Sequence, residues 1–255
     1  MTLALEPTAL YGFLFALARC SAWVVLVPPF NSRMVPAQVK IGIAAGLALI
    51  VGGHMPSNEM PVETGAFVLA LLAQVFTGLL LGFLTLMLFS AVQAAGSLID
   101  LSGGFTISQA YDPFSNAQSS SFGRFYQLLA VTLLFAINGH LLLIKGFLTS
   151  FDALPMGVPN MASAQSLLTV GLGKMMIAAI EIAGPMLAAL FLAELTLGML
   201  TKASPQMNVF AISFPAKILL TLVLLGFLLP VLPEQVTSLI NTAVKDGMHL
   251  SQAGN

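Results

Sequence analysis

Charged side chains are scarce in this chain of 255 residues, in which Asp, Glu, Lys and Arg together make up only 7%. A soluble domain typically carries roughly 25%, and nine basic and ten acidic side chains cannot cover the surface of a soluble globule of this size. The scarcity excludes a cytosolic enzyme, a nucleic-acid-binding protein with a basic face and a disordered tail protein. The net charge of −1 says nothing about partners.

Residues that form disulfides, hold metals or perform catalysis are also few. Cys20 is the single cysteine, which excludes a disulfide framework and a cysteine-based metal site. The histidines and aspartates are scattered without ligand spacing: His54, His140, His249, Asp100, Asp112, Asp152 and Asp246. Neither a nucleophile elbow, a zinc-protease motif nor a phosphate-binding glycine loop is present. We therefore expect no enzymatic activity, no catalytic residue, no cofactor and no metal.

Hydrophobic residues are abundant at 58%, and the mean hydropathy is +0.96. A transmembrane helix needs roughly 20 consecutive apolar residues. Six regions of the chain approach or exceed that length: Leu10–Phe30, Val39–Gly53, Gly65–Leu101, Phe125–Phe151, Leu167–Leu200 and Val209–Val231. The sequence therefore predicts an all-α, integral membrane protein with a single membrane domain over residues 1–255.

Two of these regions are too long for one simple crossing. As a single helix, 65–101 would measure about 55 Å at about 1.5 Å per residue, whereas the hydrocarbon core is about 30 Å thick. The region 167–200 has the same excess and contains Pro185, which predicts a kink. We expect long, kinked helices and hairpins that project beyond the bilayer into partner proteins.

The residues after Pro233 have a different pattern. Val236, Leu239, Ile240, Ala243 and Val244 follow helical spacing, with an acid near the start and a base near the end. This pattern predicts an amphipathic helix over 234–248, which we expect to dock on a partner or on the membrane surface.

The candidate intramembrane charges are Arg19, Glu181, Glu194 and Lys217, each of which lies inside an apolar region. Such groups face the interior of a helix bundle or water, and they pair with one another. Two interpretations stay open: structural ion pairs, or the lining of a polar pathway. The sequence does not indicate which acid meets which base.

The stretch Ser102–Gly123 has no helical period and no run of charge. Loops longer than about 12–15 residues are usually functional or disordered, and this one contains bulky apolar residues that argue against disorder. Its glycines permit a hinge, and Pro113 stiffens its exit. It is either a folded cytoplasmic loop or a re-entrant, plug-like element. The residues that would form the plug are Gly103, Gly104, Phe105, Ile107, Ser108, Gln109, Tyr111, Asp112 and Pro113.

Five short motifs occur in order along nearly the whole chain. The first motif is Arg19 and Pro28 followed by Arg33-Met-Val-Pro36 and Lys40-Ile-Gly42, and the second is Gly104-Phe105 followed by Tyr111-Asp112-Pro113. The third is Asn138-Gly139-His140. The last two stand close together, Ala203-Ser-Pro205-Gln206-Met-Asn208 and Phe214-Pro215-Ala-Lys217-Ile218. Together these motifs resemble the FliR family, the export-gate membrane protein of the flagellar type III secretion apparatus, and its counterparts in virulence secretion.

The resemblance implies a fold and a role. Residues 1–151 would form a FliP-like part that includes the plug loop 102–123, and residues 163–255 a FliQ-like helical hairpin. The chain would assemble with FliP-like and FliQ-like subunits in lipid, partly raised above the bilayer, at the flagellar basal body in the bacterial inner membrane. Six clean crossings would then be an overestimate.

The resemblance also implies what passes through this assembly and what contacts it. Unfolded flagellar proteins would pass through its centre. The hairpin tip, with Pro205, Gln206 and Asn208, would lie near an FlhB-like switch protein. No nucleic acid is expected as a partner.

An alternative function is a small-solute transporter or an ion-channel subunit, with Arg19, Glu181 and Glu194 as a midplane site. Transporters of that kind usually carry paired broken helices in two corresponding halves. The sequence shows no such internal symmetry, which favours the export subunit.

Overall fold

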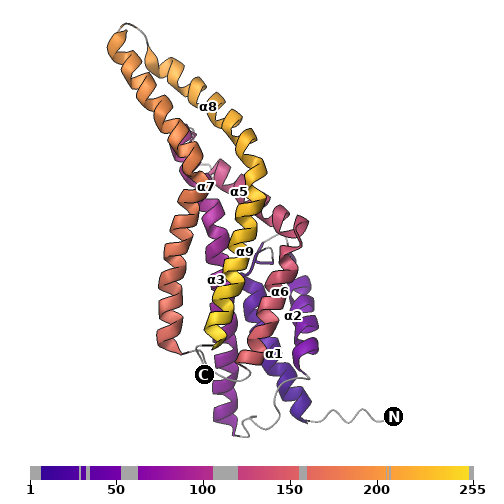
Figure 1. Cartoon of the computed structure of the whole chain (residues 1–255). Coiled ribbons are helices and arrows are strands. Elements are labelled where there is room, and N and C mark those ends of the chain that lie inside the picture. Colours follow the sequence, from indigo (N-terminus) through magenta and orange to yellow (C-terminus); the bar gives the residue numbers. More distant parts are fainter. Residues whose placement is uncertain are drawn as a thin grey trace. The chain divides into compact units, whose positions relative to one another are not determined.

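The computed structural model describes residues 7–28, 30–32, 35–52, 63–105, 120–154, 160–204, 206 and 208–252. These residues form helices, with no β-strand among them (Figure 1). The predicted all-α class is confirmed. A chain this apolar is expected in lipid, which offers no hydrogen-bond partners, and an α-helix satisfies its backbone N–H and C=O groups within its own segment. The helices are α1 (Pro7–Leu26), α2 (Ala37–Gly52), α3 (Thr64–Gly103), α5 (Ser121–Ala136), α6 (Gly139–Ala153), α7 (Met161–Ala203), α8 (Val209–Leu228), the short η2 (Leu229–Val231) and α9 (Leu232–Gln252).

Four helical segments are long and apolar enough to cross a membrane, judged by length and composition. They are Ala9–Leu26, Thr64–Gly103, Met161–Ala203 and Ala211–Met248. The two over-long regions are present as single helices, since α3 has 40 residues and α7 has 43. The last of these segments continues past two prolines, a residue type that often ends a helix. Pro230 lies in η2 and Pro233 in the first turn of α9, where a helix tolerates a missing N–H.

Two of the six expected spans are corrected by the structure. With 16 residues, α2 is shorter than the roughly 20 that a span needs. The region 125–151 is not one helix, because α5 and α6 are bent by 79° at the break between them. Asn138 at this break has a φ of 56°, a left-handed conformation that asparagine tolerates better than most residues. A fifth span exists only if this bent pair counts as one.

The chain divides into two compact units, each built from separate stretches of sequence. Unit 1 comprises Met1–Leu88, Asn138–Leu172 and Leu239–Asn255. In this unit α1 and α3 pack closely at two glycines of α3. If Gly78 carried a side chain, its Cβ would stand only 2.9 Å from the Cβ of Ala22, and a Cβ at Gly82 would stand 3.0 Å from the Cβ of Leu26. This small-residue pair therefore permits a close helix contact, whereas a Cβ atom at Gly42 or Gly46 would meet no described atom within 4 Å.

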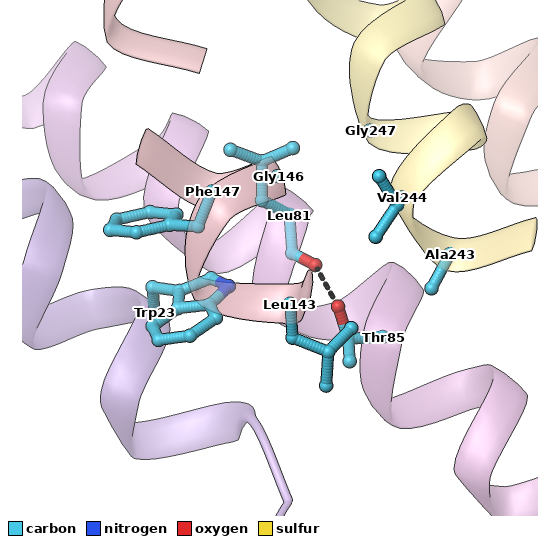
Figure 2. Close-up of a pocket in the computed structure, with 9 residues that line it drawn as sticks. All are labelled: Trp23, Leu81, Thr85, Leu143, Gly146, Phe147, Ala243, Val244 and Gly247. Atoms are coloured by element: carbon cyan, nitrogen blue, oxygen red, sulfur yellow. Dashed lines mark hydrogen bonds between the residues drawn. The ribbon is translucent and has the colours of Figure 1, made fainter. Parts of the chain in front are cut away.

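The C-terminal helix packs within unit 1 from Leu239 onward. Val244 of this helix packs against Gly146 of α6: a Cβ atom at Gly146 would stand 3.1 Å from Cγ1 of Val244. The packing surrounds a small cavity of about 20 Å³ beside Trp23, whose ring stacks on Phe147 with centroids 4.3 Å apart (Figure 2). A cavity of this size has room for about one water molecule. Part of the apolar face of this helix thus packs on the chain's own helices, and its docking on a partner or on the membrane surface stays a prediction.

Unit 2 comprises Phe89–Ile137 and Gly173–Ser238. It holds the C-terminal part of α3, helix α5, and the hairpin that α7 and α8 form (Figure 1). A Cβ atom at Gly96 of α3 would stand 2.7 Å from the Cα of Gly123 in α5, so only glycine fits this crossing. The division into a FliP-like part and a FliQ-like hairpin stays a prediction, because it is defined by likeness to other proteins rather than by these units.

Candidate functional site

Arg19 of α1 is fully buried in unit 1, and its guanidinium group donates hydrogen bonds to several acceptors. Its Nε donates to Oε1 of Gln74 at 2.7 Å, its Nη1 to the carbonyl oxygen of Ser150 at 3.1 Å, and its Nη2 to that of Leu154 at 2.5 Å. The guanidinium carbon lies 4.3 Å from the ring centroid of Phe151. One side chain thus joins α1 to α3 and to the C-terminal end of α6.

The carbonyl groups that Arg19 reaches explain its position. The last carbonyls of a helix have no partner inside the helix, and a cation near that end is favoured by the helix dipole. The Leu154 carbonyl, at the C-cap of α6, is of this kind. The Ser150 carbonyl in the last turn also accepts the N–H of Leu154 at 3.0 Å, so Arg19 is its second donor. The planar guanidinium group of an arginine carries several N–H donors in fixed directions, so it binds several oxygens at once better than the ammonium group of a lysine does. Arg19 therefore acts as a tether between helices.

Among the other charged residues, Lys217 and Glu194 are brought together in unit 2. The Nζ of Lys217 donates to Oε1 of Glu194 at 3.0 Å, which joins α8 to α7. The Lys217 side chain is 13% exposed and the Glu194 side chain 66%. Glu181 is exposed on α7. Structural ion pairing was one of the two interpretations that the sequence left open, and within the described part of the chain this pair joins the two helices of the hairpin.

The base of the long loop is built around Asp100 in unit 2. Its Oδ2 accepts hydrogen bonds from the hydroxyl of Ser120 and from the backbone N–H of Phe122, the latter at 3.0 Å. Ser120 is also the N-cap of α5, since its Oγ accepts from the N–H of Gly123 at 2.8 Å. Asp100 is fully buried, and its Oδ1 has no hydrogen-bond partner among the described residues.

The start of the loop is fixed on the same residue and on α8. The N–H of Phe105 donates to the backbone carbonyl of Asp100 at 3.1 Å, and its ring lies edge-on to Phe122 with centroids 4.9 Å apart. A Cβ atom on Gly103 would stand 2.9 Å from Oγ1 of the buried Thr221 in α8. Gly104 has a φ of +84°, which glycine adopts without strain.

Both edges of the predicted loop are helical, because α3 extends to Gly103 and α5 begins at Ser121. Of the predicted plug residues, the structure describes Gly103, Gly104 and Phe105. The others lie outside the described residues, namely Ile107, Ser108, Gln109, Tyr111, Asp112 and Pro113. Sequence reasoning did not select Asp100, although its position offered a signal: it is an acid at the end of a long apolar helix, just before an irregular stretch.

The hairpin tip is described in part. Asn208 is the N-cap of α8, and its Oδ1 accepts from the N–H of Ala211 at 3.4 Å. Gln206 is exposed, and Pro205 lies outside the described residues. An asparagine is a favoured N-cap, so Asn208 has a structural role in starting α8 in addition to its predicted role in contacting a partner.

A groove of about 440 Å³ lies between α3 and α7 in unit 2. Ser90, Gln93 and Ser97 line one side of it with polar groups, and Met176 and Ile180 line the other with apolar ones. Within the described part of the chain, no group of three or more His, Cys, Asp or Glu side chains could hold a metal ion.

The fold and these contacts define a multi-pass, all-helical membrane protein whose few polar side chains join helices to one another. The sequence profile described as "Bacterial export proteins, family 1" matches residues 10–243, and the chain belongs to this family.

The chain is also similar to curated flagellar biosynthetic proteins and to a surface presentation of antigens protein. The chain is 34% identical over 221 residues to the flagellar biosynthetic protein FliR of Bacillus subtilis (strain 168), covering 84% of each chain. It is 32% identical over 222 residues to FliR of Pectobacterium carotovorum subsp. carotovorum, covering 87% of this chain and 85% of that protein. It is also 25% identical to the surface presentation of antigens protein SpaR of Shigella sonnei, over 80% of this chain and 79% of that one.

Proposed function

We propose that this chain is a membrane subunit of a flagellar type III protein export gate, located in the bacterial inner membrane at the flagellar basal body. With FliP-like and FliQ-like subunits it forms the channel through which unfolded flagellar proteins leave the cell. The membership of the export family over residues 10–243, and the FliR relatives over more than four fifths of their length, carry this proposal.

The exposed apolar surface supports an obligate assembly. Only 6% of the most apolar window of Ala211–Met248 and 28% of that of Met161–Ala203 are buried within the chain. Phe191, Met199 and Phe227 are 60%, 73% and 75% exposed on the hairpin. The helices are also longer than a bilayer is thick, so lipid alone does not cover them. Companion helices would cover the remainder.

The long loop is the proposed plug of the closed channel. Its ends are anchored by buried contacts, and its first residues include a glycine with positive φ and an aromatic ring. Anchored ends with an irregular segment between them suit an element that moves without unfolding the helices on either side. The tip of the hairpin, at Gln206 and Asn208, is the proposed contact with an FlhB-like protein.

Copurification tests the assembly. A tagged chain expressed with the neighbouring export genes should bring down two other small hydrophobic subunits in mild detergent. A chain that purifies without them would refute the assembly and would favour the alternative of a small-solute transporter or ion-channel subunit.

Shortening the loop over 105–110 tests the plug. The assembled complex should then become permeable to ions or small solutes in its resting state, measured as leak in cells or in liposomes. Copurification serves as the assembly control. Loss of assembly would indicate a structural loop, and an assembled but tight complex would refute the plug.

A further inference from the structure

Glu181 is an acid near the middle of the 43-residue helix α7, in unit 2. Between Lys174 and Lys202 the sequence of this helix carries no other charged residue except Glu194. Glu194 has a partner in Lys217. The exposed side chain of Glu181, in contrast, makes no hydrogen bond and no ion pair with any residue that the structure describes. An acid inside an apolar helix usually pairs with another group, so the chain alone leaves Glu181 incomplete.

The backbone of the same residue offers a second acceptor. Pro185 lies inside α7, four residues further along. Because proline has no N–H, the usual helical hydrogen bond to the carbonyl oxygen of Glu181 cannot form. In membrane proteins neighbouring helices supply donors to such freed backbone groups. Glu181 therefore presents a carboxylate and a carbonyl oxygen, and a cation with several N–H donors suits the two together. The fixed donors of an arginine match that requirement better than the ammonium group of a lysine does.

The surface around Glu181 is apolar and open. Ile177, Ile180 and Leu192 of α7 are 59%, 55% and 63% exposed. A Cβ atom at Gly184 would meet no described atom within 4 Å, so another helix has room to approach the backbone there closely. A negative charge within an apolar surface is complementary to an apolar helix that carries one positive charge.

We propose that Glu181 is the docking point for a helix of a companion subunit, and that this helix is apolar except for an arginine or lysine that pairs with Glu181. The proposal rests on the proposed function, because it needs the companion subunits of the export gate. It assigns to α7 an ion pair between subunits, in addition to the pair within the chain that Lys217 and Glu194 form.

The first experiment compares Glu181→Leu and Glu181→Gln in the full chain, expressed with its companion subunits. Glu181→Leu should lower the amount of copurified companion about tenfold or more, because a buried cation that loses its partner shifts an equilibrium by at least that factor. Glu181→Gln should have a smaller effect, since the amide oxygen still accepts a hydrogen bond. Glu63→Leu is the matched control, because it removes an exposed acid just before α3, and it should assemble normally.

A second experiment excludes simple misfolding of the variant. Each basic residue in the apolar helices of the companions is changed to leucine, one at a time, together with Glu181→Leu. One of these changes should restore assembly, because replacing both charges of a buried pair by apolar side chains is well tolerated. A misfolded chain would not be rescued by a change in another protein.

Two results would overturn the ion pair: normal assembly of Glu181→Leu, or loss of assembly that no change in a companion restores. Rescue by a change of a basic residue in this chain would also overturn it, because the cation would then belong to the chain itself or to a second copy. If the unchanged chain copurifies with no companion, the proposed function itself fails. If it does copurify and Glu181→Leu assembles equally well, the ion pair alone is refuted.

Discussion

Replacing Arg19 with leucine should weaken the fold of unit 1. Leucine is apolar and removes the donors to Gln74 Oε1 and to the carbonyls of Ser150 and Leu154. A buried acceptor without a partner costs about 1–3 kcal/mol. The Ser150 carbonyl keeps the N–H of Leu154, so the other two acceptors together cost roughly 4 kcal/mol at mid-range. Burying an arginine at membrane depth itself costs roughly 2.5–3.5 kcal/mol, and leucine avoids that cost. The net loss is therefore about 1 kcal/mol, to be compared with the roughly 5–15 kcal/mol that stabilises a typical protein.

The measurement is denaturant unfolding of the copurified complex in mild detergent, with the amount of assembled complex as a second readout. Lys245→Leu is the matched control, because it removes a cation from an exposed position on α9. Arg19→Lys should fall between the two, since an ammonium cannot reach three oxygens with the geometry of a guanidinium. Gln74→Ala should cost less than Arg19→Leu, because it disturbs one of the three contacts.

Equal stability and equal assembly of Arg19→Leu and Lys245→Leu would refute this reasoning. A rise in stability with leucine would mean that the cost of burying the cation exceeds the value of its hydrogen bonds, as happens when a buried charge is replaced by a well-packed apolar side chain.

Three further predictions follow from the packing. Gly96→Ala should destabilise unit 2, because its Cβ would stand 2.7 Å from the Cα of Gly123. Gly173→Ala is the control and should be tolerated, because no described atom lies within 4 Å of a Cβ at that position. The denaturation midpoints of complexes that carry either change test this. Lys217→Met should lower the yield of assembled complex only slightly, because Glu194 is 66% exposed and water solvates its carboxylate when the 3.0 Å partner is removed; a large loss of yield that the double change with Glu194→Gln restores would contradict this. The chain expressed without companions should be degraded or aggregate, since much of its apolar surface is exposed, and a monodisperse, protease-resistant monomer would contradict this.

Hydrophobic composition predicted the helical class and the two very long helices correctly. It failed at α2 and at the break between α5 and α6, and for physical reasons. The apolar region 39–53 already indicated a helix about as short as α2, which has 16 residues, so the error there was to count so short a region as a span. Window hydropathy also does not detect the left-handed backbone of Asn138, which interrupts an otherwise apolar run. The amphipathic pattern of α9 was visible in the sequence, but the surface that covers it, with Gly146 opposite Val244, depends on tertiary packing between residues distant in sequence.

The same limit applies to the polar residues. Arg19 was conspicuous in the sequence as a charge in an apolar region, but its partners are backbone carbonyls and an amide, which no charge pattern indicates. Asp100 was less conspicuous because it stands at the end of its helix. Its importance appears only when the chain returns at Ser120 and places a helix N-terminus against it.

Arg19 and Asp100 show how two buried charged side chains in one membrane protein can serve different ends. The hydrogen bonds of Arg19 reach α3 and the C-terminal end of α6, and the ring of Phe151 covers its guanidinium; satisfaction of this kind makes movement costly. The side chain of Asp100 accepts donors on one oxygen and leaves the other without a partner among the described residues. A buried carboxylate that loses its donors pays the full cost of its desolvation, which is larger for a charged group than for a neutral one. The two described hydrogen bonds of Asp100 therefore hold the start of α5 against the end of α3.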